Sequence, residues 1–166
     1  MAFTSASLDE LLEMIGPEIS SEEHVLTSTD DCNLWVRQYT GRVVEPMLSK
    51  IEGIADIMEI VSPLQHALDN TYHRAYDSEQ GREVKVRHVF GQKGYLVQII
   101  DEGKGFEPEP IIKAFQEGKE QRYAHYNYNG WMFRTLNKND ILARIDSSTK
   151  PPTGTTVSIA YLYKTP

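Results

Sequence analysis

Cysteine is almost absent from this chain of 166 residues, which contains only Cys32. A single cysteine excludes an internal disulfide and any CxxC site, and it suits a reducing compartment. No apolar run approaches the roughly 20 residues that cross a bilayer, and the first residues lack the basic region and apolar stretch of a secretory signal. We therefore expect a cytoplasmic protein that does not act in a membrane.

Basic residues are also in short supply, with 17 Lys and Arg against 24 Asp and Glu and a formal net charge of −7. This balance argues against nucleic acid or an anionic membrane as the main partner. The five histidines show no metal-ligand spacing, which makes a metal-centred hydrolase the weakest of the functional hypotheses. The length and the hydrophobic content of 40% fit a soluble globular chain with a sizeable core.

The most informative stretch is YLVQIIDEGKGF, residues 95–106. Its first half is rich in β-branched and aromatic residues and predicts a buried strand. Asp101 ends that strand, and Gly103 and Gly105 follow one residue apart. This pattern places a fixed acceptor beside backbone that can approach a ligand closely. An ordinary Asp/Gly turn after a strand explains the same residues equally well.

Periodicity and turn signals predict the remaining elements. The predicted helices are one over 8–15 capped by Ser7, one from residue 29 that breaks or kinks at Pro46, and a short one over 111–116. The predicted strands are an edge strand over 24–28, a strand over 83–90 that forms a hairpin with 95–100, a strand over 141–145 and a last strand over 155–163. A polar connector is predicted over 20–23, and a polar and aromatic loop or lid over 117–129.

A further helix carries the second informative pattern, because apolar residues from Ile54 to Ala75 recur at helical spacing on one face. Pro63 either kinks this helix or starts a new one with Ser62 as its N-cap. On another face His66 and Asn70 are stacked four residues apart. A solvated polar face is the alternative explanation of that stack.

Together these pieces resemble the Bergerat ATP-binding fold, the GHKL domain shared by gyrase, sensor histidine kinases and MutL. Over about residues 24–164 the chain is most similar to the small anti-sigma-factor serine kinases of bacterial partner-switching systems. The resemblance implies an α/β (α+β) two-layer sandwich, with a mixed, mostly antiparallel sheet covered by helices on one face. It implies an ATP-binding domain over 23–166, preceded by an N-terminal helical extension over 1–22.

The resemblance also assigns ligands to particular residues. Asp101 would accept a hydrogen bond from the adenine amino group, with Thr155 assisting, and Gly103 and Gly105 would let the backbone pass close to the nucleotide. Asn70 would offer its amide oxygen to Mg²⁺.

Gly130, at the start of a helix, would meet the phosphates of ATP. Lys119 or Arg122, on the loop before it, could reach the γ-phosphate.

Two departures from the family pattern bear on catalysis. The family places a glutamate, the general base, four residues before the asparagine, and this chain has His66 there. Histidine can act as a base near neutral pH, so His66 is the candidate catalytic residue. Tyr128 stands where a glycine is usual, two residues before Gly130. Tyr128 would crowd the phosphates or require another path of the loop, and the change of base favours nucleotide binding over efficient catalysis.

Three functional hypotheses follow from the resemblance. The first is a regulatory Mg-ATP-binding protein that acts on a protein partner of the sigma-factor or anti-sigma-antagonist type, with phosphoryl transfer to a serine or threonine of the partner as an additional activity. The second is a degenerate scaffold on the same fold, with little or no turnover. The third is the catalytic half of a split histidine kinase. The amphipathic helix near the N-terminus could also support a homodimer, although packing on its own domain explains it better.

Overall fold

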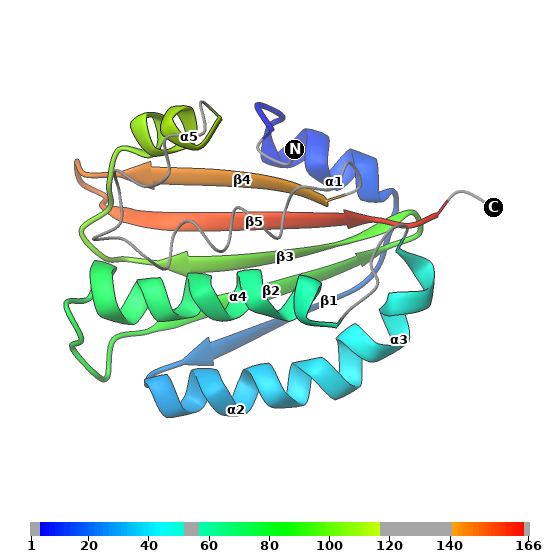
Figure 1. Cartoon of the computed structure of the whole chain (residues 1–166), viewed down its shortest axis with the longest axis horizontal. Coiled ribbons are helices and arrows are strands. Elements are labelled where there is room, and N and C mark those ends of the chain that lie inside the picture. Colours follow the sequence, from blue (N-terminus) through cyan, green and yellow to red (C-terminus); the bar gives the residue numbers. More distant parts are fainter. Residues whose placement is uncertain (1–3, 52–56, 117–140, 165–166) are drawn as a thin grey trace.

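The computed structural model of the chain describes residues 4–51, 57–116 and 141–164. Within these ranges the helices are α1 (Leu8–Ile15), α2 (Thr29–Tyr39), α3 (Glu45–Met47), α4 (Met58–Asn70) and α5 (Pro108–Gln116), and the strands are β1 (Glu18–Leu26), β2 (Val84–Gly91), β3 (Gly94–Asp101), β4 (Ile141–Ser148) and β5 (Gly154–Leu162) (Figure 1). Short π-helical and 3₁₀ turns extend three of the helical segments: η1 (Thr40–Val44) after α2, η2 (Leu48–Lys50) after α3 and η3 (Thr71–Ala75) after α4.

The strands form one sheet in the order β1-β2-β3-β5-β4. Every strand pair in the described part of the chain is antiparallel. The predicted hairpin is confirmed, because β2 and β3 pair from Val84↔Asp101 to Phe90↔Tyr95. The last predicted strand, β5, lies between β3 and β4. The interior position of β3 explains its continuous apolar run, since both of its faces are covered.

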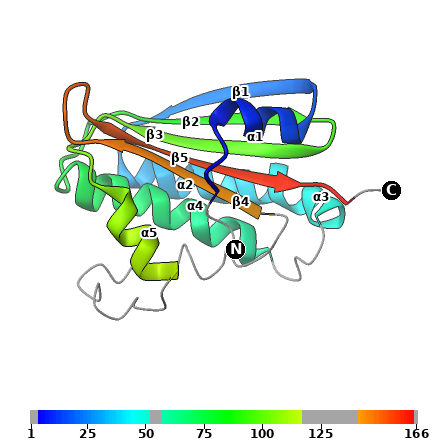
Figure 2. The same ribbon diagram turned by 90° about the horizontal axis from the view of Figure 1, so that it is seen from above.

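Helices α2 and α4 cover one face of the sheet, while α1 lies on the other (Figures 1 and 2). The larger core lies under α2 and α4, where Leu64 and Leu68 of α4 pack with Tyr95 and Val97 of β3. The expected two-layer α/β fold with a largely antiparallel sheet is therefore confirmed. α1 adds a smaller second core to the opposite face.

That second core depends on the N-terminal helix. Leu11 and Ile15 are fully buried against Val89, Leu96 and Ala160 of the sheet. The predicted cap of this helix is confirmed, since the Ser7 hydroxyl accepts from the Glu10 amide at 3.2 Å and the Glu10 carboxylate accepts from the Ser7 amide at 2.6 Å. The amphipathic face of α1 is thus used within its own chain.

The prediction of a polar connector over residues 20–23 is wrong, because these residues belong to β1. Ser21 pairs with Val89 and Glu23 with Arg87 of β2. The strand lies at the edge of the sheet, and its first six residues are exposed. Without a buried face there is no alternation of apolar and polar residues to reveal a strand. The predicted boundary between residues 22 and 23 falls inside β1.

Helix α4 runs from Met58 through Pro63 to Asn70 without interruption, so a new helix starting at Ser62 is not formed. Pro63 is buried within it, and the predicted apolar face is confirmed for Val61, Leu64 and Leu68. Ile54 lies outside the described residues. None of the helices in the described ranges is both long and apolar enough to cross a membrane.

Candidate nucleotide-binding site

Asp101 lies at the end of β3 and is 7% exposed. One carboxylate oxygen accepts the Gly103 amide at 2.9 Å, and the other accepts the Thr71 hydroxyl at 3.4 Å. Burial raises the pKa of Asp101, and hydrogen bonds from Gly103, Thr71 and the Thr155 backbone oppose that rise. A carboxylate has about four lone-pair sites, so these bonds fix the group and leave acceptor capacity for a ligand.

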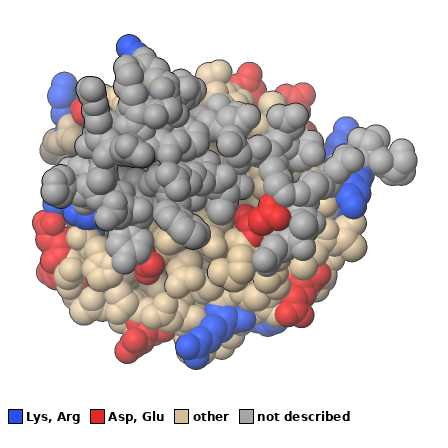
Figure 3. All heavy atoms as spheres, viewed as in Figure 1, with Lys and Arg blue, Asp and Glu red and all other residues tan. Residues whose placement is uncertain are grey.

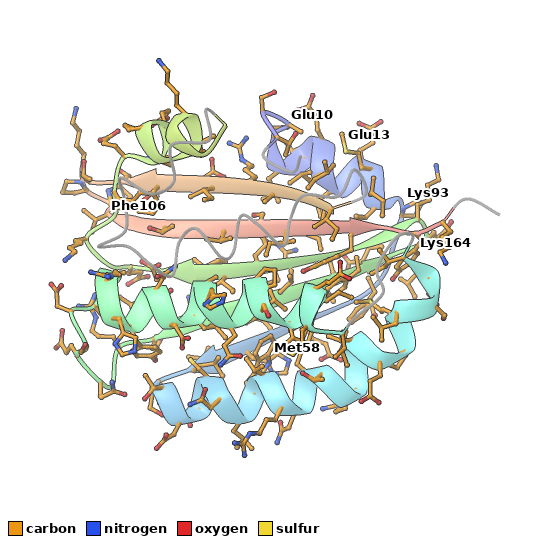
Figure 4. All side chains as sticks on the ribbon, in the orientation of Figure 1. Glu10, Glu13, Met58, Lys93, Phe106 and Lys164 are labelled. Atoms are coloured by element: carbon orange, nitrogen blue, oxygen red, sulfur yellow. The ribbon has the colours of Figure 1, made fainter. Side chains whose placement is uncertain are left out.

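Thr155 stands directly opposite Asp101 in the pairing of β3 with β5. It is buried, and its hydroxyl lies 2.9 Å from the hydroxyl of Ser147 on β4. The same Ser147 oxygen accepts the Phe106 amide at 3.0 Å. The loop after Asp101 is therefore tied across β5 to the edge strand, and Phe106 marks this end of the sheet in Figure 4.

The two glycines after Asp101 are required by packing within the protein. A Cβ on Gly103 would lie 2.4 Å from the Cβ of Ala75 and 2.8 Å from its carbonyl oxygen. Gly105 has a φ of +67°, and a Cβ there would lie 2.0 Å from the Ser148 carbonyl oxygen. These contacts explain both glycines without a ligand, and a contact with a nucleotide stays a prediction.

The C-terminal end of α4 reaches the same corner of the sheet. Thr71, which bonds to Asp101, directly follows Asn70, and both Asn70 and His66 are half-buried. Burial lowers the pKa of His66, and the nearby Asp69 carboxylate opposes that shift. The His66 imidazole is therefore neutral at pH 7.

Positive charge also lies close to Asp101. Arg82 donates to the Glu102 carbonyl at 3.0 Å and lies over the Tyr76 ring at 4.5 Å from its centroid. Its charge lowers the pKa of Asp101, although less than the hydrogen bonds do. Lys104 is held 2.7 Å from the Asp77 carboxylate. This end of the sheet thus carries two of the chain's few cations.

Part of the predicted site lies outside the described residues, namely Gly130 with Tyr128, Lys119 and Arg122. Among the residues that the structure does describe, no three His, Cys, Asp or Glu side chains are grouped to hold a metal ion. The amide oxygen of Asn70 remains the candidate protein ligand for Mg²⁺, and phosphates and water would supply the other oxygens.

Thr71 and Ser147 were missed by the sequence analysis. Thr71 continues the line of Leu64 and Leu68 at helical spacing, and a hydroxyl on a core-facing line signals a buried polar partner. That signal could have linked Thr71 to Asp101. Ser147 offers no such signal, because its role depends on the pairing of β4 with β5.

No family model matches the sequence, and no curated protein matches it either. In structure the chain is similar to the mycobacterial sensor histidine kinase MprB. The TM-score is 0.50 at 17% identity, over 86% of this chain and 99% of that chain. The two chains share a fold. That shared fold agrees with the ATP-binding fold expected from the resemblance, and at this identity it shows nothing about activity.

Proposed function

We propose that this protein is an ATP-binding regulatory module of the anti-sigma-factor serine kinase type. The observation that carries the proposal is the meeting of Asp101, Thr155 and the Asn70–Thr71 end of α4 at one corner of the sheet. Three separate segments supply these residues, and together they offer a buried acceptor, a hydroxyl and an amide oxygen. A carboxylate that accepts one amino proton selects adenine over bases that lack the amino group.

The donor set fits a Mg-nucleotide. Asp101 would bind the adenine amino group, Thr155 would hold Asp101 in place, and Asn70 would contribute one hard oxygen ligand to Mg²⁺. When bound, Mg-ATP supplies a transferable phosphoryl group whose charge the metal neutralises. Arg82 would stabilise the ionised form of Asp101 while the adenine excludes water from it.

Binding without efficient turnover is the second candidate function, and His66 favours it. In the family a carboxylate stands at this position, whereas the half-buried His66 is neutral at pH 7. A neutral imidazole can accept a proton but supplies no negative charge, and the loss of a positioned base costs about 10²–10⁴ in rate. Substitution of His66→Glu tests whether the residue at this position limits phosphoryl transfer. A gain of transfer activity would show that the change from carboxylate to imidazole at position 66 accounts for the lost turnover.

Calorimetric titration with ATP and ADP, with and without Mg²⁺, tests the proposal. We expect saturable binding that strengthens with Mg²⁺ and disappears in Asp101→Asn. Asp30→Asn, an exposed carboxylate in the first turn of α2, is the matched control and should bind as the wild type does. Asn70→Ala should reduce the Mg²⁺ dependence. No binding at millimolar nucleotide by the folded protein would overturn the kinase proposal and leave the scaffold.

The phosphoacceptor and the partner are tested separately. MprB is a sensor histidine kinase, so transfer to histidine is tested beside transfer to serine or threonine. Phosphohistidine is lost in acid whereas phosphoserine survives, so acid treatment of the labelled partner separates the two. Light scattering with and without ATP tests whether the chain forms a homodimer.

A further inference from the structure

A cavity of about 340 Å³ lies at the other end of the sheet from Asp101. It is open to solvent and lies between β1 and β2 on one side and α2, η1, α3 and η2 on the other. Tyr163, which precedes Lys164, also lines it, and Lys164 and Phe106 mark opposite ends of the molecule in Figure 4. Two lining residues give the separation along the sheet: Phe90 pairs with Tyr95, six positions or about 20 Å from Asp101, and His88 pairs with Val97, four positions or about 13 Å from Asp101. The cavity shares no residue with the candidate nucleotide site.

Aromatic rings form much of the cavity wall. Trp35 and Tyr39, one turn apart on α2, stack at 4.8 Å with an angle of 19° between their rings. His88 on β2 lies 5.3 Å from Trp35 and is nearly parallel to Phe90. These rings are buried against one another, with Trp35 7% and Tyr39 3% exposed, so the surface that they offer a ligand is rigid and apolar and suits dispersion contact with an aromatic ring. The cavity volume lies at the lower end of the range for small-molecule sites, about 300–1,000 Å³.

A buried chain of hydrogen bonds fixes the rings behind this wall. The Tyr39 hydroxyl donates to the Tyr95 hydroxyl at 2.6 Å, and Tyr95 in turn bonds to Nδ1 of His88. With Tyr95 as the donor to Nδ1, the neutral imidazole carries its proton on Nε2. The wall is therefore set before any ligand arrives, which lowers the ordering cost of binding.

The lining of the cavity contains two cations and one carboxylate, although the whole chain has a formal charge of −7. Arg42 and Lys50 both line it, and the Lys50 ammonium lies 5.5 Å from the centre of the Tyr163 ring. The carboxylate of Glu22 also lines the cavity and lies 3.4 Å from Nε2 of His24. An anionic ligand is favoured over a cationic one, because both cations would repel the latter.

We propose that this cavity is a second, independent binding site for a small planar aromatic carboxylate, with its ring against Trp35 and Tyr39 and its carboxylate between Arg42 and Lys50. A bound aromatic acid would join η1 and η2 to the β1–β2 edge. The site would then report the level of an aromatic acid separately from the level of ATP.

Three probes of the same shape and different charge test the proposal. Naphthalene-2-carboxylate, naphthalene-2-carboxamide and 2-naphthylmethylammonium are titrated into the full chain by calorimetry. We expect the carboxylate to bind most tightly and the ammonium least. Spectra of the labelled protein should show shifts at the Trp35 indole N–H and at residues of β1, with none at Gly103. Equal affinities for the three probes, or no binding by the folded protein, would overturn the proposal.

Charge variants locate the carboxylate. Arg42→Gln and Lys50→Gln should each weaken the carboxylate probe about two- to fivefold, as for exposed ion pairs, and should leave the carboxamide unchanged. Arg37→Gln, an exposed arginine on α2 that does not line the cavity, is the matched control. If Arg37→Gln weakened the carboxylate probe by the same factor, the loss of affinity would come from the overall charge of the protein. That result would overturn the proposed placement of the carboxylate.

Independence from the nucleotide site is checked in the same titrations. ATP is itself an aromatic anion, so it is added as a competitor. We expect the probe to bind equally well in Asp101→Asn and in the presence of saturating ATP. Displacement of the probe by ATP would overturn the proposal of a separate site, whereas a failure of ATP to bind anywhere would leave it standing.

Discussion

At the scale of single residues, Gly103 shows how tightly the candidate site is built. Gly103→Ala would place a Cβ 2.4 Å from the Ala75 Cβ, and we expect it to lower the free energy of unfolding by about 1–3 kcal/mol. Gly41→Ala is the control, because a Cβ at Gly41 meets nothing within 4 Å. Urea denaturation of both variants measures the difference. Equal effects would show that the end of η3 can move away from the β3 loop.

The buried carboxylate of Asp101 makes a pH-dependent prediction. Burial raises the pKa of Asp101 above the ordinary value of 3.8. The folded state then binds the proton more tightly than the unfolded state, so the free energy of unfolding decreases as pH rises from 3.8 through the raised value. In Asp101→Asn this decrease is absent. Denaturation at several pH values should show the variant gaining stability relative to the wild type across that interval.

His88 makes the opposite prediction at the other end of the sheet. Burial lowers its pKa from 6.5 to about 4, and repulsion from His24 adds to the shift. The unfolded chain takes up a proton below pH 6.5 while the folded chain does not, so stability falls between pH 6.5 and 4, by about 3 kcal/mol in total. His88→Phe should reduce this fall.

Tyr95→Phe serves as the control for that measurement. It removes the hydrogen bond to His88 but keeps the titrating imidazole, so its stability should still fall steeply with acid. A curve for His88→Phe as steep as that of the wild type would assign the acid sensitivity to another group.

The sequence predicted individual residues only where a local pattern carried the information. Asp101 was placed at the end of a strand because the apolar run stops there. The predicted strand over 83–90 contains His88, but the bond from His88 to Tyr95 arises across the hairpin and continues to α2 through Tyr39. Contacts between distant segments of this kind depend on the sheet register, which residue spacing does not give.

At the scale of elements, α1 is an integral part of the fold. Leu11 is fully buried against the sheet, whereas Met14 on the same helix is 41% exposed. Leu11→Ala should lower the free energy of unfolding by about 2–5 kcal/mol, and Met14→Ala should change it by less than about 0.5 kcal/mol. Comparable small effects in both variants would mean that α1 is an extension that the sheet does not need.

The elements that could be predicted are those with one buried face. Periodicity and turn signals predicted the hairpin of β2 and β3, and helical spacing in α4 predicted its core-facing side. β1 was predicted only from residue 24 because the exposed residues before it carry no such pattern. β1 is held to β2 by hydrogen bonds between backbone groups. At a solvent-exposed edge these bonds are compatible with any polar side chain.

At the scale of the whole molecule, the two candidate sites differ in the groups that they offer a ligand. At one end Asp101 is buried, and at the other Arg42 and Lys50 line an aromatic cavity. Over the described part of the face in Figure 3, basic and acidic side chains are interspersed. The net charge of −7 therefore does not decide which ligand each end binds.

The sheet that separates the two sites predicts how the stabilising effects of their ligands combine. A ligand whose free concentration is about 100 times its Kd adds about 2.7 kcal/mol to the free energy of unfolding. For a chain of this size that corresponds to a rise in Tm of about 5–10 °C.

Because the nearest cavity-lining residue on β2, His88, pairs with Val97, about 13 Å along β3 from Asp101, and the two sites share no residue, the increments from Mg-ATP and naphthalene-2-carboxylate should add. Thermal melts with each ligand alone and with both provide the measurement, and Asp101→Asn should lose only the nucleotide increment. A combined shift clearly different from the sum would show that the sheet couples the two ends, so that an aromatic acid would regulate ATP binding.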